Sequence, residues 1–222
     1  MEAVLETLRQ SPRLPDYVRE MQALLETERQ ARERFYEEVR EDQKAEFING
    51  EIVMHSPARD RHLETRDNLA ELLRTHVRVF HLGTVRGEKA LCVFPRNDYE
   101  PDVVFFGPEK SALIQPNTRK FPIPDFAAEV LSESTERTDR REKFQDFEAH
   151  GVLEYWIVDA DRGVIEQYLV EDGRYVLTLK SGSGEIESPT VSGFRIPIAA
   201  IFDAELHLAT LRRILSVPSA HP

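Results

Sequence analysis

The sequence predicts an α/β fold in which helices flank a mixed β-sheet, with a long helix near the N-terminus. Three observations lead to this fold class. Apolar residues recur at helical spacing in a charged segment near the N-terminus, and an Asn-Gly pair separates two short apolar stretches. After these, helix, strand, strand, strand, helix and strand follow one another, an order that is typical of α/β sandwiches.

The first long helix is expected to run from Asp16, as N-cap, to about Lys44. A helix-breaking Ser-Pro-Arg-Leu-Pro stretch precedes it. Its apolar residues recur every three or four positions, and these are Tyr17, Met21, Leu24, Ala31 and Phe35. Glu28 and Glu38 interrupt this stripe. Two interpretations remain open, namely an amphipathic helix packed on its own domain and a helix that pairs with a second copy.

The middle of the chain begins with a β-hairpin over 45–54, because Asn49-Gly50 is a strong two-residue turn signal. A helix is expected over 61–80, closed by Gly83. The other expected elements are strands at 90–94, 102–106, 126–131 and 154–159, a polar helix at 138–150, a hairpin of 163–170 with 174–180, and a short helix at 204–216. Residues 96–100 are interpreted as a polar turn and 108–124 as a loop.

Composition narrows the class of protein. Hydrophobic residues at 41% and charged residues at 31% are typical of a globular domain, and no apolar run approaches the roughly 20 residues that span a bilayer. The first ten residues lack the pattern of a signal peptide. The lone Cys92 excludes an internal disulfide and a multi-cysteine zinc site, which fits a reducing cytoplasm. The net charge of -11 opposes non-specific binding of nucleic acids, whose phosphates dominate affinity.

Two carboxylates lie in apolar surroundings. Asp102 opens the run Asp-Val-Val-Phe-Phe, and Glu129 lies late in Phe-Ala-Ala-Glu-Val-Leu. A buried carboxylate is costly unless it is paired, so two of them on neighbouring strands, with Lys143 on the next helix, suit a divalent metal and a scissile phosphate. Carboxylate oxygens are ligands that Mg²⁺ prefers, the metal activates water, and the lysine can orient that water or stabilise charge.

Each of these residues also has an ordinary structural explanation. An Asp after Pro often caps a turn, and a lysine on a helix commonly faces solvent. A glutamate within an apolar strand needs only one good partner. The combination of the three, rather than any one of them, indicates a metal-dependent nuclease.

The ordered motifs resemble the Uma-two family, whose members are described as restriction endonucleases of the PD-(D/E)XK nuclease superfamily. The resemblance covers roughly residues 45–202. The segments that carry it are NGEIVMHSPARDRH (49–62), PDVV (101–104), PDFAAEVLSEST (124–135), DRREKF (139–144) and GVLEYWIVDA (151–160), with GFRIPIAAIFD near the end. It implies a restriction-endonuclease-like sheet flanked by helices and a site that contains Asp102, Glu129 and Lys143.

The sequence departs from the superfamily pattern at two positions of the site. The lysine that normally follows the glutamate by two residues is Leu131 here, so the resemblance implies that Lys143 has taken over its role. Phe147 stands where similar sequences often have Tyr, and no hydroxyl is available there. The long charged N-terminal helix also differs from the usual short start of the family.

Two further residues match the family. Glu51 follows the Asn-Gly turn, and it is either the exposed face of a hairpin or an extra ligand for metal or water. His62 opens a helix after Ser-Pro, and it is either a polar cap or a group that faces the phosphate. The other histidines lack metal-ligand spacing.

These patterns predict residues 1–44 as an N-terminal helical extension and 45–222 as a PD-(D/E)XK nuclease-like domain. The expected function is magnesium- or manganese-dependent cleavage of DNA by a cytoplasmic homodimer. Asp102 and Glu129 are the expected metal ligands, while Lys143, His62 and Glu51 complete the site. Two alternatives stay open, namely a catalytically silent module that binds nucleic acid or protein, and a phosphoesterase acting on RNA or a small substrate.

Overall fold

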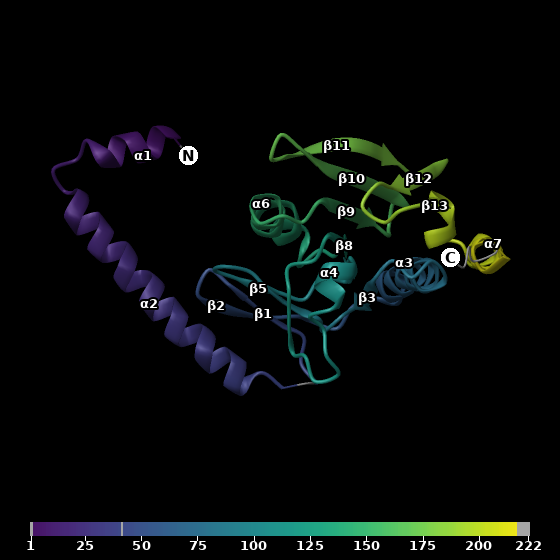
Figure 1. Ribbon diagram of the computed structural model, residues 1–222, viewed down its shortest axis with the longest axis horizontal. Helices are drawn as coiled ribbons and strands as arrows, with labels where there is room; N and C mark the ends of the chain where they lie inside the picture. The colour runs from purple at the N-terminus through teal and green to yellow at the C-terminus, as the bar shows by residue number, and fades with distance from the viewer. Residues whose placement is uncertain (1, 41, 217–222) are drawn as a thin grey trace.

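Two mixed β-sheets form the body of the protein in the computed structural model, which describes residues 2–40 and 42–216 (Figure 1). The six-stranded sheet has the strand order β11-β10-β9-β8-β6-β3, and the five-stranded sheet has the order β2-β1-β5-β4-β7. Strands β8 and β9 run parallel in the first sheet, as do β4 and β7 in the second. The remaining pairs are antiparallel, so the expected mixed sheet flanked by helices is confirmed.

The strands are short and mostly buried. The six-stranded sheet consists of β3 (Thr84–Gly87), β6 (Val103–Phe106), β8 (Phe126–Val130), β9 (Glu154–Asp159), β10 (Val164–Glu171) and β11 (Arg174–Ser181). The five-stranded sheet consists of β1 (Ala45–Ile48), β2 (Glu51–Met54), β4 (Leu91–Val93), β5 (Asp98–Tyr99) and β7 (Lys120–Phe121). A separate hairpin pairs β12 (Glu185–Ser188) with β13 (Phe194–Pro197).

The helices lie around these sheets. They are α1 (Glu2–Arg9), α2 (Leu14–Glu38), α3 (Asp60–Val79), α4 (Pro108–Ser111), α5 (Glu136–Thr138), the π-helix η1 (Asp139–Lys143), α6 (Phe144–Ala149), the 3₁₀-helix η2 (Ile198–Ile201) and α7 (Ala204–Ser216).

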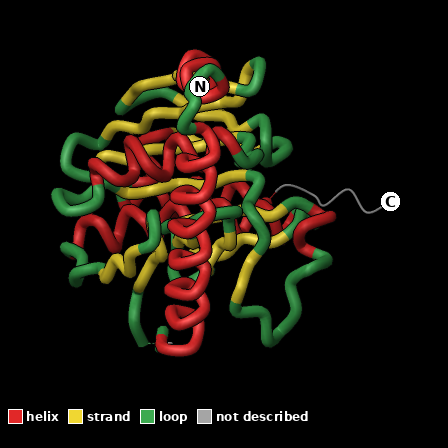
Figure 2. The backbone as a smooth tube through the Cα atoms, turned by 90° about the vertical axis from the view of Figure 1, so that its left-hand side faces the viewer, coloured by secondary structure: helices red, strands yellow, loops and turns green. Residues whose placement is uncertain are grey.

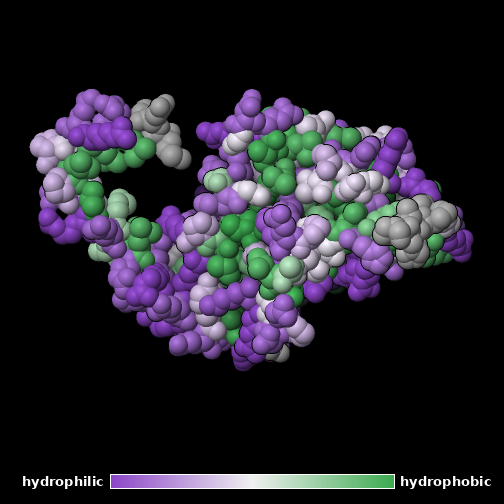
Figure 3. Space-filling model, in the orientation of Figure 1, coloured by the Kyte–Doolittle hydropathy of each residue, from purple (hydrophilic) through white to green (hydrophobic). Residues whose placement is uncertain are grey.

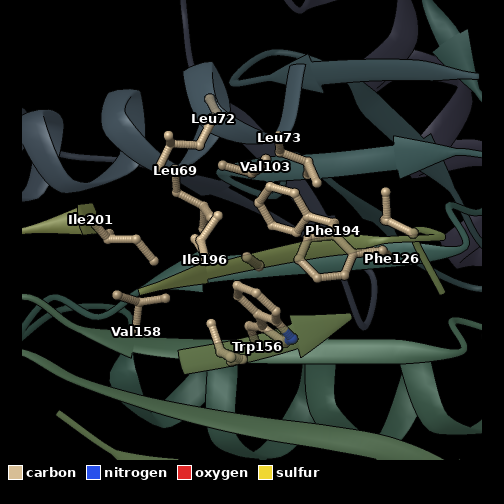
Figure 4. Close-up of a cluster of buried hydrophobic side chains, with 14 of the residues drawn as sticks. Leu69, Leu72, Leu73, Val103, Phe126, Trp156, Val158, Phe194, Ile196 and Ile201 are labelled. Carbon is tan, nitrogen blue, oxygen red and sulfur yellow. The ribbon is translucent and has the colours of Figure 1, made fainter. Parts of the chain in front are cut away.

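One face of the six-stranded sheet packs against α3, η2, α7 and the β12–β13 hairpin. Because side chains alternate along a strand, every second residue of β6, β8 and β9 enters this core. Figure 4 shows Leu69, Leu72 and Leu73 of α3 above Phe126 and Trp156 of the sheet. The helix expected over 61–80 therefore buries the stripe that its spacing predicts.

The opposite face of the six-stranded sheet meets the five-stranded sheet. This second core joins alternate residues of β6, β8 and β9 to β1, β4, β5 and α6, and it includes Ile48, Cys92, Val104, Ala127, Phe147 and Tyr155. Phe147 stacks on Phe94 within it, with ring centroids 5.2 Å apart. This face matters for function. Every second residue along β6, counted from Val104, and along β8, counted from Ala127, points between the two sheets.

The second half of helix α2 packs on the outer face of the five-stranded sheet. Phe35 is buried there against Phe47, and Arg32 binds both carboxylate oxygens of Asp98. Its first half, together with α1, projects from the body as an arm (Figure 1), and α2 runs in front of the sheets when the molecule is viewed from that side (Figure 2). The second half thus fits the interpretation of an amphipathic helix packed on its own domain, while pairing with a second copy stays a prediction.

Several expected boundaries were wrong. Helix α2 begins at Leu14 after Arg13 rather than at an Asp16 cap, and it ends at Glu38 rather than near Lys44. Strand β5 occupies part of the expected polar turn 96–100, and α4 and β7 occupy part of the expected loop 108–124. Strands β3, β12 and β13 were not expected at all. The helix expected over 138–150 is divided into η1 and α6.

Candidate active site

Asp102 and Glu129 meet because β6 and β8 are antiparallel neighbours. Val103 pairs with Ala128, so Asp102 and Glu129 are opposite each other at the next position of the register. Both side chains point between the two sheets. The backbone N–H of Asp102 donates to Glu129 Oε2 at 3.4 Å, and that of Val130 donates to Asp102 Oδ2 at 2.9 Å. The two carboxylates are nearly inaccessible to solvent, at 2% and 3% exposed.

Lys143 reaches the same place from the π-helix η1. Its Nζ donates to Glu129 Oε1 at 2.7 Å and lies 3.0 Å from Glu46 Oε1 and 3.2 Å from Asp139 Oδ1. The wider turn of a π-helix, a feature that is frequent at functional sites, carries both Asp139 and Lys143 inward. Lys143 is 2% exposed, so its ammonium group neutralises carboxylates from beneath the site rather than extending into solvent.

Glu46 is a member of this cluster that the sequence interpretation missed. Glu46 lies on β1, and its side chain points to the same face as that of Ile48, toward the core between the two sheets. Ala45 and Phe47 point to the opposite face, toward α2. Glu46 Oε1 accepts the backbone N–H of Glu100 at 2.8 Å, and Glu46 Oε2 lies 3.0 Å from His55 Nε2. The alternation in Ala-Glu-Phe-Ile is the signal that could have identified it.

Lys44 and His62 approach Asp102 from the open side. Lys44 Nζ donates to Asp102 Oδ1 at 2.8 Å, and His62 Nε2 lies 3.6 Å from Asp102 Oδ2. His62 comes from the first turn of α3, and its Nδ1 is buried without a hydrogen-bond partner in the described part of the chain. The structure therefore brings His62 to the carboxylate pair, and it adds Lys44, which the sequence interpretation did not single out.

A cleft of about 480 Å³ opens above these groups. Its lining includes Asp102, Glu129, Lys143, Lys44 and His62, and its rim carries Arg59, Arg61 and Lys89. Glu51 does not line this cleft. It lies exposed on the edge strand β2, opposite Ile48, while Val53 of that strand is the residue opposite Glu46. The geometry therefore gives Glu51 no contact with the carboxylate pair.

The electrostatics of the cluster follow from burial and from its charge imbalance. Burial raises the pKa of Glu129 well above its ordinary value, although Lys143 opposes this. Burial also raises the pKa of Asp102, but His62 and Lys44 outweigh it and hold that pKa below its usual range. For Glu46, Lys143 and His55 overcome burial and lower the pKa to about 2. Burial and the neighbouring carboxylates therefore disfavour the charged form of Glu129.

A divalent cation fits the carboxylate pair. Four buried carboxylates, Glu46, Asp102, Glu129 and Asp139, surround two buried or half-buried lysines, Lys44 and Lys143. Across residues 2–40 and 42–216, no group of three or more His, Cys, Asp or Glu side chains is arranged to hold a metal ion. Magnesium commonly takes one or two protein carboxylates and keeps several waters. The donor type and the surplus negative charge thus suit magnesium or manganese at Asp102 and Glu129.

Comparison with known proteins assigns the chain to a family. The model of the Uma2 family, described as "Putative restriction endonuclease", matches residues 30–199. The chain is a member of the Uma2 family. The match begins within α2 and includes every residue of the cluster described above. No curated protein matches the chain.

A solved structure shares the fold of this Uma2 protein. It is described as a crystal structure of a putative nuclease belonging to DUF820 from Anabaena variabilis. The TM-score is 0.65 at 18% sequence identity, and the alignment covers 80% of this chain and 96% of the other. The expected nuclease fold is thereby confirmed. No helix in the described residues is both long enough and apolar enough to cross a membrane.

Proposed function

We propose that this Uma2 protein is a magnesium- or manganese-dependent endonuclease that hydrolyses phosphodiester bonds in DNA. The observation that carries the proposal is the convergence of Asp102 and Glu129, from adjacent strands, at the floor of a cleft. Membership of a family described as restriction endonucleases supports the same activity.

In this proposal each residue of the cleft has a separate role. Asp102 and Glu129 would hold the ion, which when bound polarises a phosphate and lowers the pKa of a bound water. His62 lines the cleft beside Asp102 and would accept a proton there. Lys44 carries positive charge at the open side of Asp102, where a phosphate can approach.

Lys143 has a different role from the one expected of a surface-facing lysine. It holds Glu129 in position and offsets the charges of Glu46 and Asp139. Because it is enclosed by three carboxylates, it stabilises the charge of the site from within. Glu51 is left without a role in the proposal, since it lies outside the cleft.

The second candidate function is a catalytically silent module that binds nucleic acid or protein. The enclosure of Lys143 among carboxylates and the net charge of -11 favour it, because an acidic protein repels the phosphates of a nucleic acid. The two candidates differ in metal binding, which the active enzyme requires.

The test combines metal binding with cleavage. Calorimetric titration of magnesium and of manganese, with and without a DNA duplex, should show binding to the wild type. Asp102→Asn and Glu129→Gln should each abolish that binding and lower the cleavage of plasmid DNA by at least about 100-fold, the scale on which loss of a metal ligand's partners already reduces activity.

Glu171→Gln is the matched control, because it removes a carboxylate at the exposed end of β10, away from the cleft. It should bind metal and cleave as the wild type does, and circular dichroism should show all three variants folded. Full cleavage by a folded Asp102→Asn or Glu129→Gln protein would overturn the proposal. Absence of metal binding by the wild type, even with DNA present, would favour the silent module.

The assembly and location of the protein belong to the same proposal. A homodimer is supported by the arm formed by α1 and residues 14–27, which exposes Val4, Leu5, Val18, Met21, Leu24 and Leu25. A reducing cytoplasm is supported by the lone Cys92, which is a buried free thiol.

A further inference from the structure

Three arginines gather beside the candidate active site. Arg74 and Arg78 lie on α3, and Arg86 lies on the neighbouring edge strand β3. Arg86 donates to the backbone carbonyl of Val85 at 3.0 Å. In the described part of the chain, none of the three forms an ion pair with Asp or Glu. We call these residues the arginine cluster.

The arginines of the cluster lie close enough to repel one another. Burial and the nearby positive charges of Arg74 and Arg78 lower the pKa of Arg86. The chain has 40 acidic against 29 basic residues, so carboxylates are plentiful. The neighbouring Arg66 does have such partners, since it binds Asp67 and Glu88. Like charges that gather without counter-charges are suited to an anion supplied from outside the chain.

The cluster adjoins the strand that carries Asp102. A Cβ atom at Gly87 would lie 3.6 Å from the carbonyl oxygen of Asp102 and 3.8 Å from Nη2 of Arg74. The guanidinium of Arg74 therefore lies against the end of β3, next to the site. Side chains on a helix lean toward its N-terminus, which is the direction in which Arg74 must extend to reach Gly87.

Helix α3 connects the cluster to the cleft along its axis. His62 lies in the first turn of the helix, whereas Arg74 and Arg78 lie in its last two turns. At about 1.5 Å per residue, the distance along the axis is about 18 Å from His62 to Arg74 and about 24 Å from His62 to Arg78. At roughly 3.4 Å per nucleotide along a duplex, this length corresponds to roughly five to seven phosphates of one strand.

We propose that Arg74, Arg78 and Arg86 bind phosphates of the nucleic-acid backbone on one side of the scissile bond. The proposal rests on the nuclease function proposed above, and it assigns the part of the substrate that α3 and β3 contact. Arginine is suited to the task, because its planar guanidinium binds phosphate through paired hydrogen bonds. It also explains how an acidic protein can hold DNA, since the contact is confined to a local basic surface.

The test measures binding separately from cleavage. A fluorescein-labelled 30-base-pair duplex is titrated by anisotropy in EDTA over a series of salt concentrations. Phosphate contacts release counterions, so each of Arg74→Gln, Arg78→Gln and Arg86→Gln should reduce the slope of log K against log salt by about 1. The reduction should be the same for duplexes of unrelated sequence. In cleavage assays, the three variants should raise KM and leave kcat unchanged.

Arg174→Gln is the matched control, because it removes the same charge where β10 and β11 join, at the end of the sheet opposite Glu129. It should keep the wild-type salt slope. A cluster variant that keeps both the wild-type slope and the wild-type KM would overturn the phosphate proposal while cleavage itself persists. If the wild type cuts no DNA but the three variants still show reduced slopes, the result would support the cluster and overturn the nuclease function.

Discussion

Buried carboxylates are stabilised in two different ways in this protein. Glu154 accepts hydrogen bonds from the neutral groups of Trp156, Gln167 and Ser188. Glu166, in contrast, receives two cations and a hydroxyl, from Arg140, Lys180 and Tyr168. Hydrogen bonds to charged groups contribute more to stability than neutral ones. Because the two cations favour the charged form of Glu166, the stability of the protein should depend on the pH at which Glu166 is ionised.

Glu166→Gln tests this dependence. Burial raises the pKa of Glu166, but Arg140, Lys180 and Tyr168 outweigh it and lower that pKa to about 2. The carboxylate is thus more acidic in the folded than in the unfolded chain, and it stabilises the fold above the unfolded pKa of about 4.3. The stabilisation is lost as the pH falls toward 2. Urea unfolding at pH 3 to 7 should show the variant less stable at pH 7, with the difference shrinking at lower pH.

Glu171→Gln provides the comparison, because Glu171 is exposed at the end of the same strand. Its free energy of unfolding should follow the wild type throughout this range. A constant difference between wild type and Glu166→Gln from pH 7 to pH 3 would show that the ion pairs contribute nothing through titration.

At the site, the sequence predicts those residues whose surroundings are local. Asp102 and Glu129 stand out because the chain places each beside apolar residues, and strand pairing alone makes them neighbours. Glu46 carries the same kind of signal in the alternation of β1. Lys44 could not have been found, because it precedes β1 in a polar stretch and reaches Asp102 only through the packing of one sheet on the other.

Elements are predictable where local chemistry determines them, and the β1–β2 hairpin is the best example. Asn49 and Gly50 both have positive φ angles, of 52° and 88°, as the expected two-residue turn requires. The turn also lies against α2, because a Cβ at Gly50 would come within 2.8 Å of Glu28 Cγ. Glu28 in turn binds Arg96, and this links the helix to the five-stranded sheet.

Gly50→Ala should destabilise the protein more than Gly173→Ala does. Both glycines have positive φ, which costs an alanine about 1 kcal/mol. At Gly173 nothing lies within 4 Å of the added methyl group, whereas at Gly50 that group displaces the Glu28 side chain. Chemical denaturation should therefore show a loss of about 1 kcal/mol for Gly173→Ala and about 2 kcal/mol for Gly50→Ala. Equal losses would show that the contact with Glu28 contributes no stability.

Other elements escape prediction because tertiary packing determines them. Strand β3 is Thr-Val-Arg-Gly, with a single buried apolar residue, and only pairing with β6 makes it a strand. The π-helix η1 has the composition of an ordinary polar helix, yet it buries Asp139 and Lys143. The division of the chain at residues 44 and 45 stays a prediction, although the family match already begins at residue 30.

At the scale of the whole molecule, charge and hydropathy are unevenly distributed. The net charge of -11 coexists with basic residues at the rim of the cleft and with the arginine cluster. Apolar residues show the same unevenness, since Figure 3 shows them gathered on the side of the arm that faces the body. The large apolar residues of the arm that are exposed are Val4, Leu5, Val18, Met21, Leu24 and Leu25.

This apolar stripe leads to the prediction of a homodimer. Val18, Met21 and Leu25 recur at helical spacing on the half of α2 that projects from the body, and a closed two-fold pairing would bury identical stripes together. Multi-angle light scattering of the wild type should give about twice the chain mass of 25.6 kDa. Met21→Glu combined with Leu25→Glu should give the monomer, because each charge would be buried without a partner. Leu113→Glu changes an equally exposed leucine in the loop after α4, and it should leave the dimer intact. A wild type that stays monomeric at micromolar concentrations would contradict the pairing of the arms and leave the first half of α2 without a partner of its own kind.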